Sequence, residues 1–380
     1  MPLATTAMHG RVEAMQARGE HVIDFSIAIS HFAAPEAVRL CVAAMASEAR
    51  LPYTAVGGAL SLRSALAHKV RAENRIDAQA EHIIATNGAK QALYEALSVL
   101  TDPGDKVLVM RPYWPAYLAT AHLLQLEVVL VDLPERVTQA FVAALPRVRV
   151  CILNNPHNPS GKVFDAQELA VLADWLGRTG SAAIVDESYE KLLFGGRHTS
   201  LASLCDWRAL KVVTLFSASQ SYAMMGWRAG FAVAPAEVVS AMETLQGPIT
   251  AAPSALTQAA IGAAFASGEP HAMVEDYRTR RDLMCALLAS ASWMRMASPA
   301  SGPYLWCDVR ALGCDTVAFA EELLARYQVA LMPGDALGCP GWIRLGYIAD
   351  DEATLKRGVA ALLAFGNEML ARHTRLRALA

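Results

Sequence analysis

An acidic residue ends one apolar run in the middle of the chain. The run Ala182–Val185 leads directly into Asp186, and Tyr189 follows three residues later. A carboxylate at the end of a buried strand is partly desolvated, so a cationic partner would stabilise its charge. The pattern indicates either a site for a positively charged ligand group or, more simply, the N-terminal cap of a helix.

A turn with the composition of an anion site lies earlier in the chain. The apolar run His82–Ala85 is followed by Gly88, Ala89 and Lys90, which open a helical pattern. Small residues let an anion approach the backbone, and the N-terminus of a helix offers free N–H groups and a positive dipole. An ordinary strand-to-helix turn would have the same composition, so this segment alone does not decide between the two.

A hydroxyl-rich segment follows the apolar run Lys211–Phe216. It contains Ser217 and Ser219, and Arg228 lies eight residues beyond Gln220. Clustered hydroxyls with an arginine suit a phosphate group, because the guanidinium donates two parallel hydrogen bonds to an oxyanion. The alternative is a solvated loop with a surface arginine.

A rigid turn follows the apolar run Val148–Leu153. The segment Asn154–Gly161 contains two prolines and a glycine, which restrict its backbone and present Asn158 as a neutral hydrogen-bond donor. An ordinary loop rich in proline and asparagine remains the alternative.

The runs that precede these segments alternate with helical patterns. Short apolar runs separated by helices predict a parallel sheet with crossover helices, and the run Ala229–Val233 is a candidate antiparallel member. We expect an α/β fold with a large domain at residues 45–269. Residues 1–44 and 270–380 would form a smaller α/β domain. In such sheets ligands bind beyond the carboxyl ends of the strands, where the polar residues above gather.

Composition excludes several classes of protein. The chain has 380 residues, 54% of them hydrophobic, with a net charge of −3. A protein that binds nucleic acid or an anionic membrane through a broad basic surface is therefore not expected. The seven cysteines and ten histidines show no metal-ligand spacing, so we expect no metal. The cysteines are scattered and odd in number, which fits reduced thiols in a cytoplasmic protein. The segment Met1–Glu20 has no continuous apolar region, so we expect no secretory signal.

The order of the segments resembles the fold-type I pyridoxal-phosphate enzymes, specifically the class I/II aminotransferases. The resemblance covers the chain from about Asp24 to about Tyr347. Its motifs are YTAVGGALSLR from Tyr53, NGAKQAL from Asn87, DPGDKVLVMRPYW ending at Trp114, NNPHNPSG from Asn154, VDESYE from Val185, SASQSYAMMGWRAGF from Ser217 and IRLGYI from Ile343.

The resemblance implies a role for each matching residue. Asp186 would pair with the pyridinium nitrogen of pyridoxal 5'-phosphate, which keeps the ring an electron sink. Arg344 would bind the substrate α-carboxylate. The remaining cofactor-binding residues are Asn158 and Tyr189 at the ring 3-hydroxyl oxygen, Trp114 on the ring face, Gly88, Ala89, Lys90, Ser217, Ser219 and Arg228 around the phosphate, and Tyr53, which reaches the phosphate across a dimer interface.

One departure from the family concerns catalysis. The family has a lysine about eight residues before the phosphate arginine, and this chain has Gln220 there. A lysine amine forms a Schiff base with the cofactor and moves the proton between substrate and cofactor. A carboxamide does neither, and loss of a placed acid–base group costs on the order of 10²–10⁴ in rate. The cofactor, pyridoxal or pyridoxamine phosphate, would therefore be bound without a covalent link.

Three interpretations of Gln220 remain open. The residue could be an introduced Lys-to-Gln change that traps a cofactor adduct. It could be natural, in a biosynthetic enzyme that works without the lysine. The protein could instead be a non-catalytic binder of pyridoxal phosphate or of its amino-acid adduct.

The resemblance also bears on substrate and assembly. The family has a Gly-x-Glu/Pro-type run where this chain has Ser26–His31. Ile27 or Ile29 would reshape the side-chain pocket, so we do not expect plain aspartate or an aromatic amino acid in the usual pose. We expect an amino acid or keto acid substrate and a homodimer with shared sites, in which Thr250 could approach the site of the partner.

Overall fold

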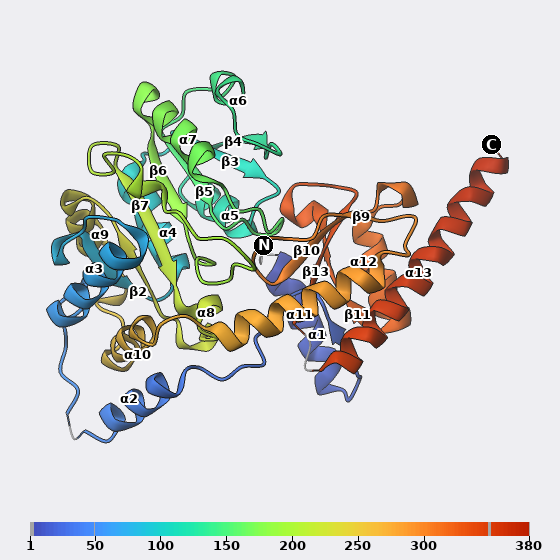
Figure 1. Cartoon of the computed structure of the whole chain (residues 1–380), viewed down its shortest axis with the longest axis horizontal. Helices are drawn as coiled ribbons and strands as arrows, with labels where there is room; N and C mark the ends of the chain where they lie inside the picture. Colours follow the sequence, from blue (N-terminus) through green and yellow to red (C-terminus); the bar gives the residue numbers. More distant parts are fainter. Residues whose placement is uncertain (1–3, 49, 349–350, 380) are drawn as a thin grey trace.

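The computed structural model describes residues 4–48, 50–348 and 351–379 (Figure 1). The ends of the predicted smaller domain, Met1 and Ala380, lie outside the described residues. A sheet of seven strands dominates the larger part, in the order β2-β8-β7-β6-β5-β3-β4. Its strands are β2 (Ile83–Thr86), β3 (Lys106–Arg111), β4 (Glu127–Asp132), β5 (Val150–Asn154), β6 (Ala182–Asp186), β7 (Val212–Ser217) and β8 (Gly230–Val233).

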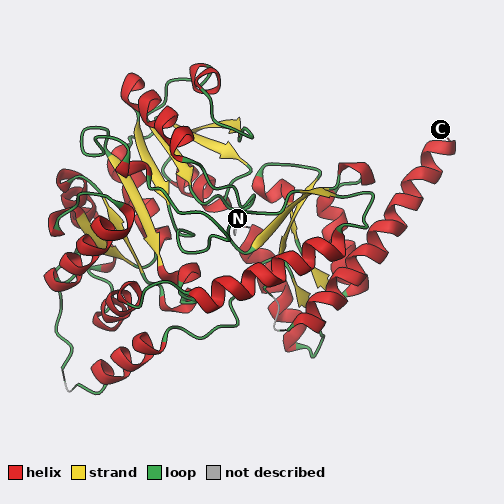
Figure 2. Ribbon diagram, in the orientation of Figure 1, coloured by secondary structure: helices red, strands yellow, loops and turns green. Residues whose placement is uncertain are grey.

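The pairing in this sheet confirms the predicted fold class. Strands β3 to β7 pair in parallel, whereas β8 is antiparallel to both β2 and β7. The side chains of β2 alternate between two cores, since Ile83 and Ala85 face one and Ile84 faces the other. A sheet buried on both faces requires such near-continuous apolar strands. Figure 2 shows helices on both sides of the strands.

Helices cover the two faces of the large sheet. α4, α5 and α9 share a core with one face, and α3, α7 and α10 share a core with the other. The helices of this part are α3 (Leu60–Asn74), α4 (Ala89–Leu100), α5 (Pro115–Leu123), α6 (Gln139–Ala143), α7 (Ala166–Thr179), α8 (Ala218–Ser221), α9 (Ala236–Thr250) and α10 (Ala255–Ala266).

Local sequence explains where α7 begins. Asp165 caps the helix by accepting hydrogen bonds from the backbone N–H groups of Gln167 and Glu168, and the Glu168 side chain accepts in return from the Asp165 N–H. This capping box satisfies N–H groups that have no partner inside the helix. The apolar stripe of the helix, which includes Leu169 and Leu172, is buried.

The smaller part contains an antiparallel sheet in the order β12-β13-β10-β9, and a two-stranded parallel sheet of β1 and β11. Its strands are β1 (Ile23–Asp24), β9 (Arg295–Met296), β10 (Tyr304–Asp308), β11 (Val329–Ala330), β12 (Met332–Pro333) and β13 (Trp342–Gly346). Its helices are α1 (Ala4–Ala17), α11 (His271–Leu288), α12 (Thr316–Tyr327) and α13 (Glu352–Leu379). In the described residues, no helix is both apolar and long enough to cross a membrane.

The N-terminal stretch divides between the two parts of the fold. The pairing of β1 with β11 joins the N-terminal stretch to the smaller part, whereas α2 (Glu36–Ala46) packs on α10, with Val38 in the core of the large part. The domain boundaries at 45 and 270 stay a prediction.

Short 3-10 segments complete the fold: η1 (Ala80–His82), η2 (Leu201–Ser203), η3 (Met225–Trp227), η4 (Arg310–Leu312) and η5 (Gly334–Leu337).

Candidate active site

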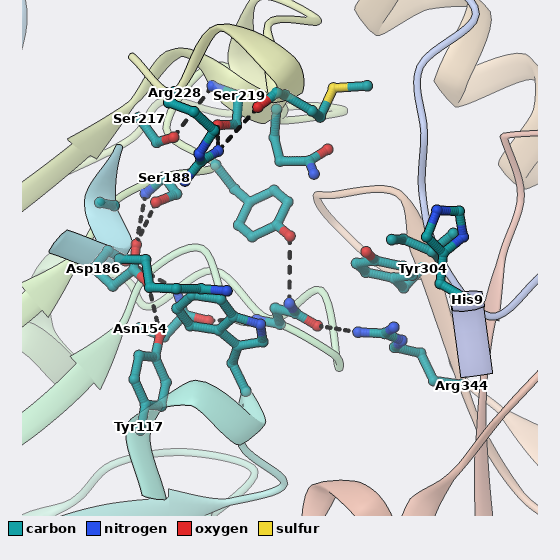
Figure 3. A pocket seen from close by; sticks show the side chains of 18 residues that line it. His9, Tyr117, Asn154, Asp186, Ser188, Ser217, Ser219, Arg228, Tyr304 and Arg344 are labelled. Carbon is teal, nitrogen blue, oxygen red and sulfur yellow. Dashed lines mark hydrogen bonds between the residues drawn. The ribbon is translucent and has the colours of Figure 1, made fainter. Parts of the chain in front are cut away.

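A cavity of about 310 Å³ lies between the ends of the large-sheet strands and the smaller part (Figure 3). Strands β5, β6 and β7 supply residues at their carboxyl ends, and β10, β13 and α1 supply the opposite wall. Eleven of the predicted site residues line it: Ala89, Lys90, Trp114, Asn158, Asp186, Tyr189, Ser217, Ser219, Gln220, Arg228 and Arg344. The fold thus brings together residues that are up to 255 positions apart, from Ala89 to Arg344.

Asp186 lies at the centre of the cavity wall and is only 5% exposed. Its Oδ1 accepts hydrogen bonds from the N–H and the hydroxyl of Ser188 at 3.0 and 2.6 Å, and its Oδ2 accepts from the Tyr117 hydroxyl at 2.7 Å. Burial raises the pKa of Asp186, while these donors lower it in part. All three donors are neutral, so the carboxylate has no positively charged partner in the part of the chain that the structure describes.

One end of the cavity is built for an anion. The Arg228 guanidinium donates to the Met225 carbonyl at 2.9 Å, and its contacts with the Asn87 carbonyl and the Ser219 hydroxyl are longer, at 3.4 and 3.5 Å. None of these partners carries a charge. Partial desolvation and the nearby Arg228 lower the pKa of Lys90. Two cations beside serine hydroxyls at the start of a helix form a typical phosphate site.

Gly88 shapes this end without lining the cavity. Its φ is +78°, and a Cβ placed there would lie 2.7 Å from Nη2 of Arg228. Only glycine adopts this backbone conformation without strain and leaves that space to the guanidinium. The residue therefore supports the anion site from behind its wall.

The opposite end of the cavity holds Arg344, which is 2% exposed. Its Nη2 donates to the Ser26 carbonyl at 2.7 Å, its Nη1 donates to Oδ1 of Asn158 at 3.3 Å, and its Cζ stacks 4.0 Å from the Tyr304 ring centre. Its Nε is buried without a hydrogen-bond partner. A buried guanidinium whose described partners are all neutral needs an anion.

Neutral donors and an aromatic face lie between the two ends. Asn158 donates from Nδ2 to the Tyr189 hydroxyl at 3.3 Å, and its backbone N–H donates to Oδ1 of Asn154 at 2.7 Å. The Trp114 ring makes an edge contact with Tyr117, with ring centres 5.5 Å apart, and Lys90 Nζ lies 5.4 Å from its centre. A flat heteroaromatic group would find a stacking surface here.

Gln220 lines the cavity from α8, the short helix capped by the Ser217 hydroxyl. Its side chain is half-buried, and no described residue hydrogen-bonds to its carboxamide. The amide is therefore available to a ligand. Ile27 also lines the cavity, whereas Ile29 is 48% exposed and lies outside it.

Besides Gly88, two predicted residues do not line the cavity of this chain. The Tyr53 side chain is fully exposed to solvent, at 101% of its reference area. Thr250, at the end of α9, accepts a hydrogen bond from Gln91 at 2.9 Å. Neither contributes to the site within one chain.

The cavity also contains residues that the sequence patterns did not single out. Asn154 opens one of the quoted motifs, and Tyr117 lies three residues beyond Trp114, where another motif ends, so the sequence held a signal near each of them. His9 and Tyr304 come from the smaller part, and nothing local in the sequence marks them. The cavity-lining residues outside the predicted site are His9, Ile27, Tyr117, Asn154, Ser188, Met225 and Tyr304. Among them, the sequence had indicated only Ile27, as a residue that would reshape the side-chain pocket.

A second polar cluster lies outside this cavity. Ligand atoms of Glu187, Glu190 and His198 lie within 4.8 Å of one another, which would suit a metal ion. Glu190, however, is hydrogen-bonded to Lys69, and Glu187 accepts from Ser200 and pairs with His198 at 2.8 Å. These ion pairs already compensate most of the charge of the carboxylates, so the cluster is a buried ion-pair network.

The charges of the main cavity define the ligand that it fits. A carboxylate without a cation lies between two cationic ends without carboxylate partners in the described chain. A molecule with an anion at one end, a cationic ring in the middle and a second anion beyond it would neutralise all three. Pyridoxal phosphate joined to an amino acid has this pattern, so the fold and the site together define the class of pyridoxal-phosphate enzymes.

Comparison with known proteins gives the same class. The sequence pattern described as "Aminotransferase class I and II" matches residues 20–362. The chain is 32% identical over 365 residues to an aspartate/prephenate aminotransferase of Thermus thermophilus, covering 92% of this chain and 93% of that protein. It is 34% identical over 355 residues to an arginine–pyruvate transaminase of Pseudomonas aeruginosa, covering 91% and 90%.

Comparison with a solved structure indicates the same class. The structure of the Thermus thermophilus aspartate aminotransferase with maleate has a TM-score of 0.90 and 30% identity, and the match covers 96% of this chain and 97% of that one. The chain therefore belongs to the class I and II aminotransferase family, whose members are pyridoxal-phosphate-dependent aminotransferases.

Proposed function

We propose that this chain binds pyridoxal or pyridoxamine 5'-phosphate without a covalent link, with Gln220 in the position of the family's lysine, and acts on the α-amino group of an amino acid. The observation that carries the proposal is the charge pattern of one cavity. Among the described residues, the Asp186 carboxylate has only neutral donors, and Arg228 and Arg344 at the two ends have only neutral acceptors.

The roles follow from the chemistry of each end. Arg228 binds the phosphate, together with the residues around it, namely Lys90, Ser217, Ser219 and the turn at Gly88 and Ala89. Asp186 pairs with the ring nitrogen, and the bound cofactor then supplies an electron sink at the substrate Cα. Asn158 and Tyr189 hydrogen-bond to the ring hydroxyl oxygen, and Trp114 covers the ring face.

Substrate binding is assigned to the other end of the cavity. Arg344 binds the α-carboxylate in a bidentate manner, because its buried Nε has no partner in the described chain. The relatives act on substrates as different as aspartate and arginine by name. The proposal therefore covers an amino acid or keto acid, and Ile27 in the cavity wall favours a substrate other than plain aspartate.

In this proposal, Gln220 distinguishes the chain from family members that have a lysine at the same position. Its carboxamide neither attacks an aldehyde nor titrates, so the protein must hold the cofactor through charges and hydrogen bonds alone. Proton transfer at the substrate Cα would then be slower by a factor on the order of 10²–10⁴, unless another group takes over. The other predicted cofactor-binding residues of the cavity are present, which favours a function that still requires the bound cofactor.

Borohydride reduction tests the covalent part of the proposal. The protein is loaded with pyridoxal phosphate, reduced, and digested for peptide mapping by mass spectrometry. We expect no pyridoxyl group on any lysine of the chain with Gln220, and one at position 220 in Gln220→Lys. A pyridoxyl group on Lys90 or Lys211 of the chain with Gln220 would contradict the proposal.

A second experiment separates turnover from binding. The loaded protein and Gln220→Lys are incubated with a panel of amino acids and keto acids while the cofactor absorbance is recorded. Progress to keto acid by the chain with Gln220 indicates an enzyme that works without the lysine, and a static spectrum indicates a binding protein. Transamination by Gln220→Lys alone indicates that the lysine is the missing catalytic group. A Gln220→Lys protein that stays inert with the whole panel counts against an aminotransferase site.

We also infer a homodimer with shared active sites. The fully exposed Tyr53 has a role only if it reaches the phosphate end of a partner's cavity. Sedimentation equilibrium should give a dimer at micromolar concentration, and Tyr53→Phe should weaken cofactor binding without changing that mass. A monomer would remove the role given to Tyr53.

A further inference from the structure

Tyr117 meets the Asp186 carboxylate from the side opposite Ser188 (Figure 3). It comes from the first turns of α5, three residues after Trp114, whereas Ser188 follows β6. The Tyr117 hydroxyl donates to Oδ2 at 2.7 Å, and Ser188 occupies Oδ1 with two hydrogen bonds. Tyr117 and Asp186 are only 3% and 5% exposed, so water does not replace a lost donor freely.

This arrangement fixes the carboxylate from both sides. With both oxygens held by donors on different elements, the plane of the carboxyl group cannot rotate without breaking a hydrogen bond. A carboxylate oxygen accepts two hydrogen bonds, so Oδ2 keeps one lone pair beyond the one used by Tyr117. That lone pair is the one available to a ring N–H in the cavity.

We propose that Tyr117 is a positioning residue that keeps Asp186 ionised and directed at the cofactor ring nitrogen. The inference rests on the proposed function, because it needs Asp186 to be the partner of the ring. It gives the hydroxyl of Tyr117 an indirect role in cofactor binding, in contrast to the residues that touch the cofactor themselves.

The surroundings of Asp186 support this role. The titratable groups that face it are the hydroxyls of Tyr117 from α5 and Tyr189 from the segment after β6, and the neighbouring strand β5 contributes the neutral Asn154, which donates to the Asp186 carbonyl. Burial raises the pKa of Asp186, and the hydrogen bonds from Ser188 and Tyr117 oppose that rise. Burial, and next the charge of Asp186, raise the pKa of Tyr117, so the phenol remains a donor.

Loss of the Tyr117 hydroxyl should change cofactor binding in one direction only. Without the Tyr117 hydroxyl, the pKa of Asp186 rises further, and the acid becomes neutral at a higher pH. A neutral carboxylic acid does not balance a pyridinium charge. Cofactor binding should therefore weaken first on the acid side, while the phosphate and Arg344 ends stay intact.

The test compares Tyr117→Phe with two matched variants. Pyridoxamine 5'-phosphate is titrated into the unmodified chain, Tyr117→Phe, Tyr222→Phe and Asp186→Asn across the acid and neutral range, and both the dissociation constant and the absorbance spectrum of the bound ligand are recorded. Tyr222→Phe removes the hydroxyl of a similarly buried tyrosine, 2% exposed, that does not line the cavity. Circular dichroism confirms that each variant is folded.

In Tyr117→Phe, we expect the fall of affinity on the acid side to occur at a higher pH. The dissociation constant in that pH range should be about tenfold larger. Tyr222→Phe should leave the pH at which the affinity falls unchanged. In an Asp186→Asn background, Tyr117→Phe should add no further effect, since it acts through the carboxylate. If Asp186→Asn changes the pH dependence of binding and Tyr117→Phe does not, the inference is wrong and the proposed function stands. If Asp186→Asn itself leaves binding unchanged, the proposed function fails as well.

Discussion

Asn158 and Arg344 are joined by a hydrogen bond of 3.3 Å from Nη1 of the arginine to Oδ1 of the asparagine. Asn158 lies in the turn after β5, and Arg344 lies on β13 of the smaller part. The contact places the predicted cofactor-binding residue and the predicted carboxylate-binding residue in one network. A substrate bound by Arg344 would therefore meet a cofactor held through Asn158, although the two residues are 186 positions apart.

Arg344→Gln should weaken substrate binding and spare cofactor binding. The substitution deletes the buried guanidinium that has no charged partner in the described chain. Hydrogen bonds to charged groups are worth about 1.5–3 kcal/mol, so amino-acid affinity should fall roughly tenfold to a hundredfold. The change is measured as the amino-acid concentration that perturbs the spectrum of the bound cofactor. Arg310→Gln, at an exposed arginine, is the control, and an equal loss in both variants would argue against the assignment.

Arg228→Gln should weaken binding of pyridoxal phosphate, because it removes a cation from the anion end of the cavity. The expected loss is again about tenfold to a hundredfold in the dissociation constant. Pyridoxal, which lacks the phosphate, should bind the variant and the natural chain equally. The two ligands are compared by fluorescence titration. A variant that loses affinity for pyridoxal to the same extent would show that Arg228 supports the fold and not the phosphate.

Gly88→Ala and Gly104→Ala separate backbone strain from the shape of the site. Both glycines have positive φ, +78° and +89°, so each alanine should cost on the order of 1 kcal/mol of folding free energy. Only at Gly88 does the added Cβ approach Arg228, whereas nothing lies within 4 Å at Gly104. Urea unfolding should show similar losses, and only Gly88→Ala should lose cofactor affinity. Unchanged affinity in Gly88→Ala would mean that the turn does not shape the phosphate end.

His157 should make stability depend on pH. Burial lowers its pKa to about 4, below the ordinary value of 6.5. The unfolded chain therefore binds a proton at a pH where the folded chain does not, so the native state loses stability as pH falls from about 6.5 toward 4. At pH 5 the loss from this group should be about 2 kcal/mol.

Urea unfolding of the natural chain and of His157→Gln across this pH window measures that contribution. The variant should show the shallower dependence on pH, and His122→Gln, at an exposed histidine, should behave like the natural chain. Equal slopes in the natural chain and His157→Gln would show that His157 is protonated without cost.

Much of the large sheet could be predicted from sequence, because its signals are local. Apolar runs of four to six residues end at a polar residue, and the box of Asp165 and Glu168 marks the start of α7. The anion turn at Gly88 was predicted for the same reason. The partnership of Tyr117 with Asp186 could not be predicted, since the spacing of 69 residues has no periodicity to reveal it.

Residues from the smaller part were the hardest to foresee. His9 and Tyr304 enter the cavity only because α1 and β10 pack beside it, and a single histidine or tyrosine has no pattern of its own. The packing of α2 on α10 likewise depends on apolar faces, Val38 among them, that would fit many partners. Local patterns thus predict elements and turns, whereas contacts between distant elements depend on the complete fold.

A crystal structure of the chain with Gln220, soaked with pyridoxamine 5'-phosphate, tests the central claim most directly. The account predicts electron density for the intact ligand, with its ring nitrogen within hydrogen-bond distance of Asp186, its phosphate on Arg228 and no bond to position 220. Density for the ligand elsewhere, or an Asp186 side chain turned away from the ring, would contradict it.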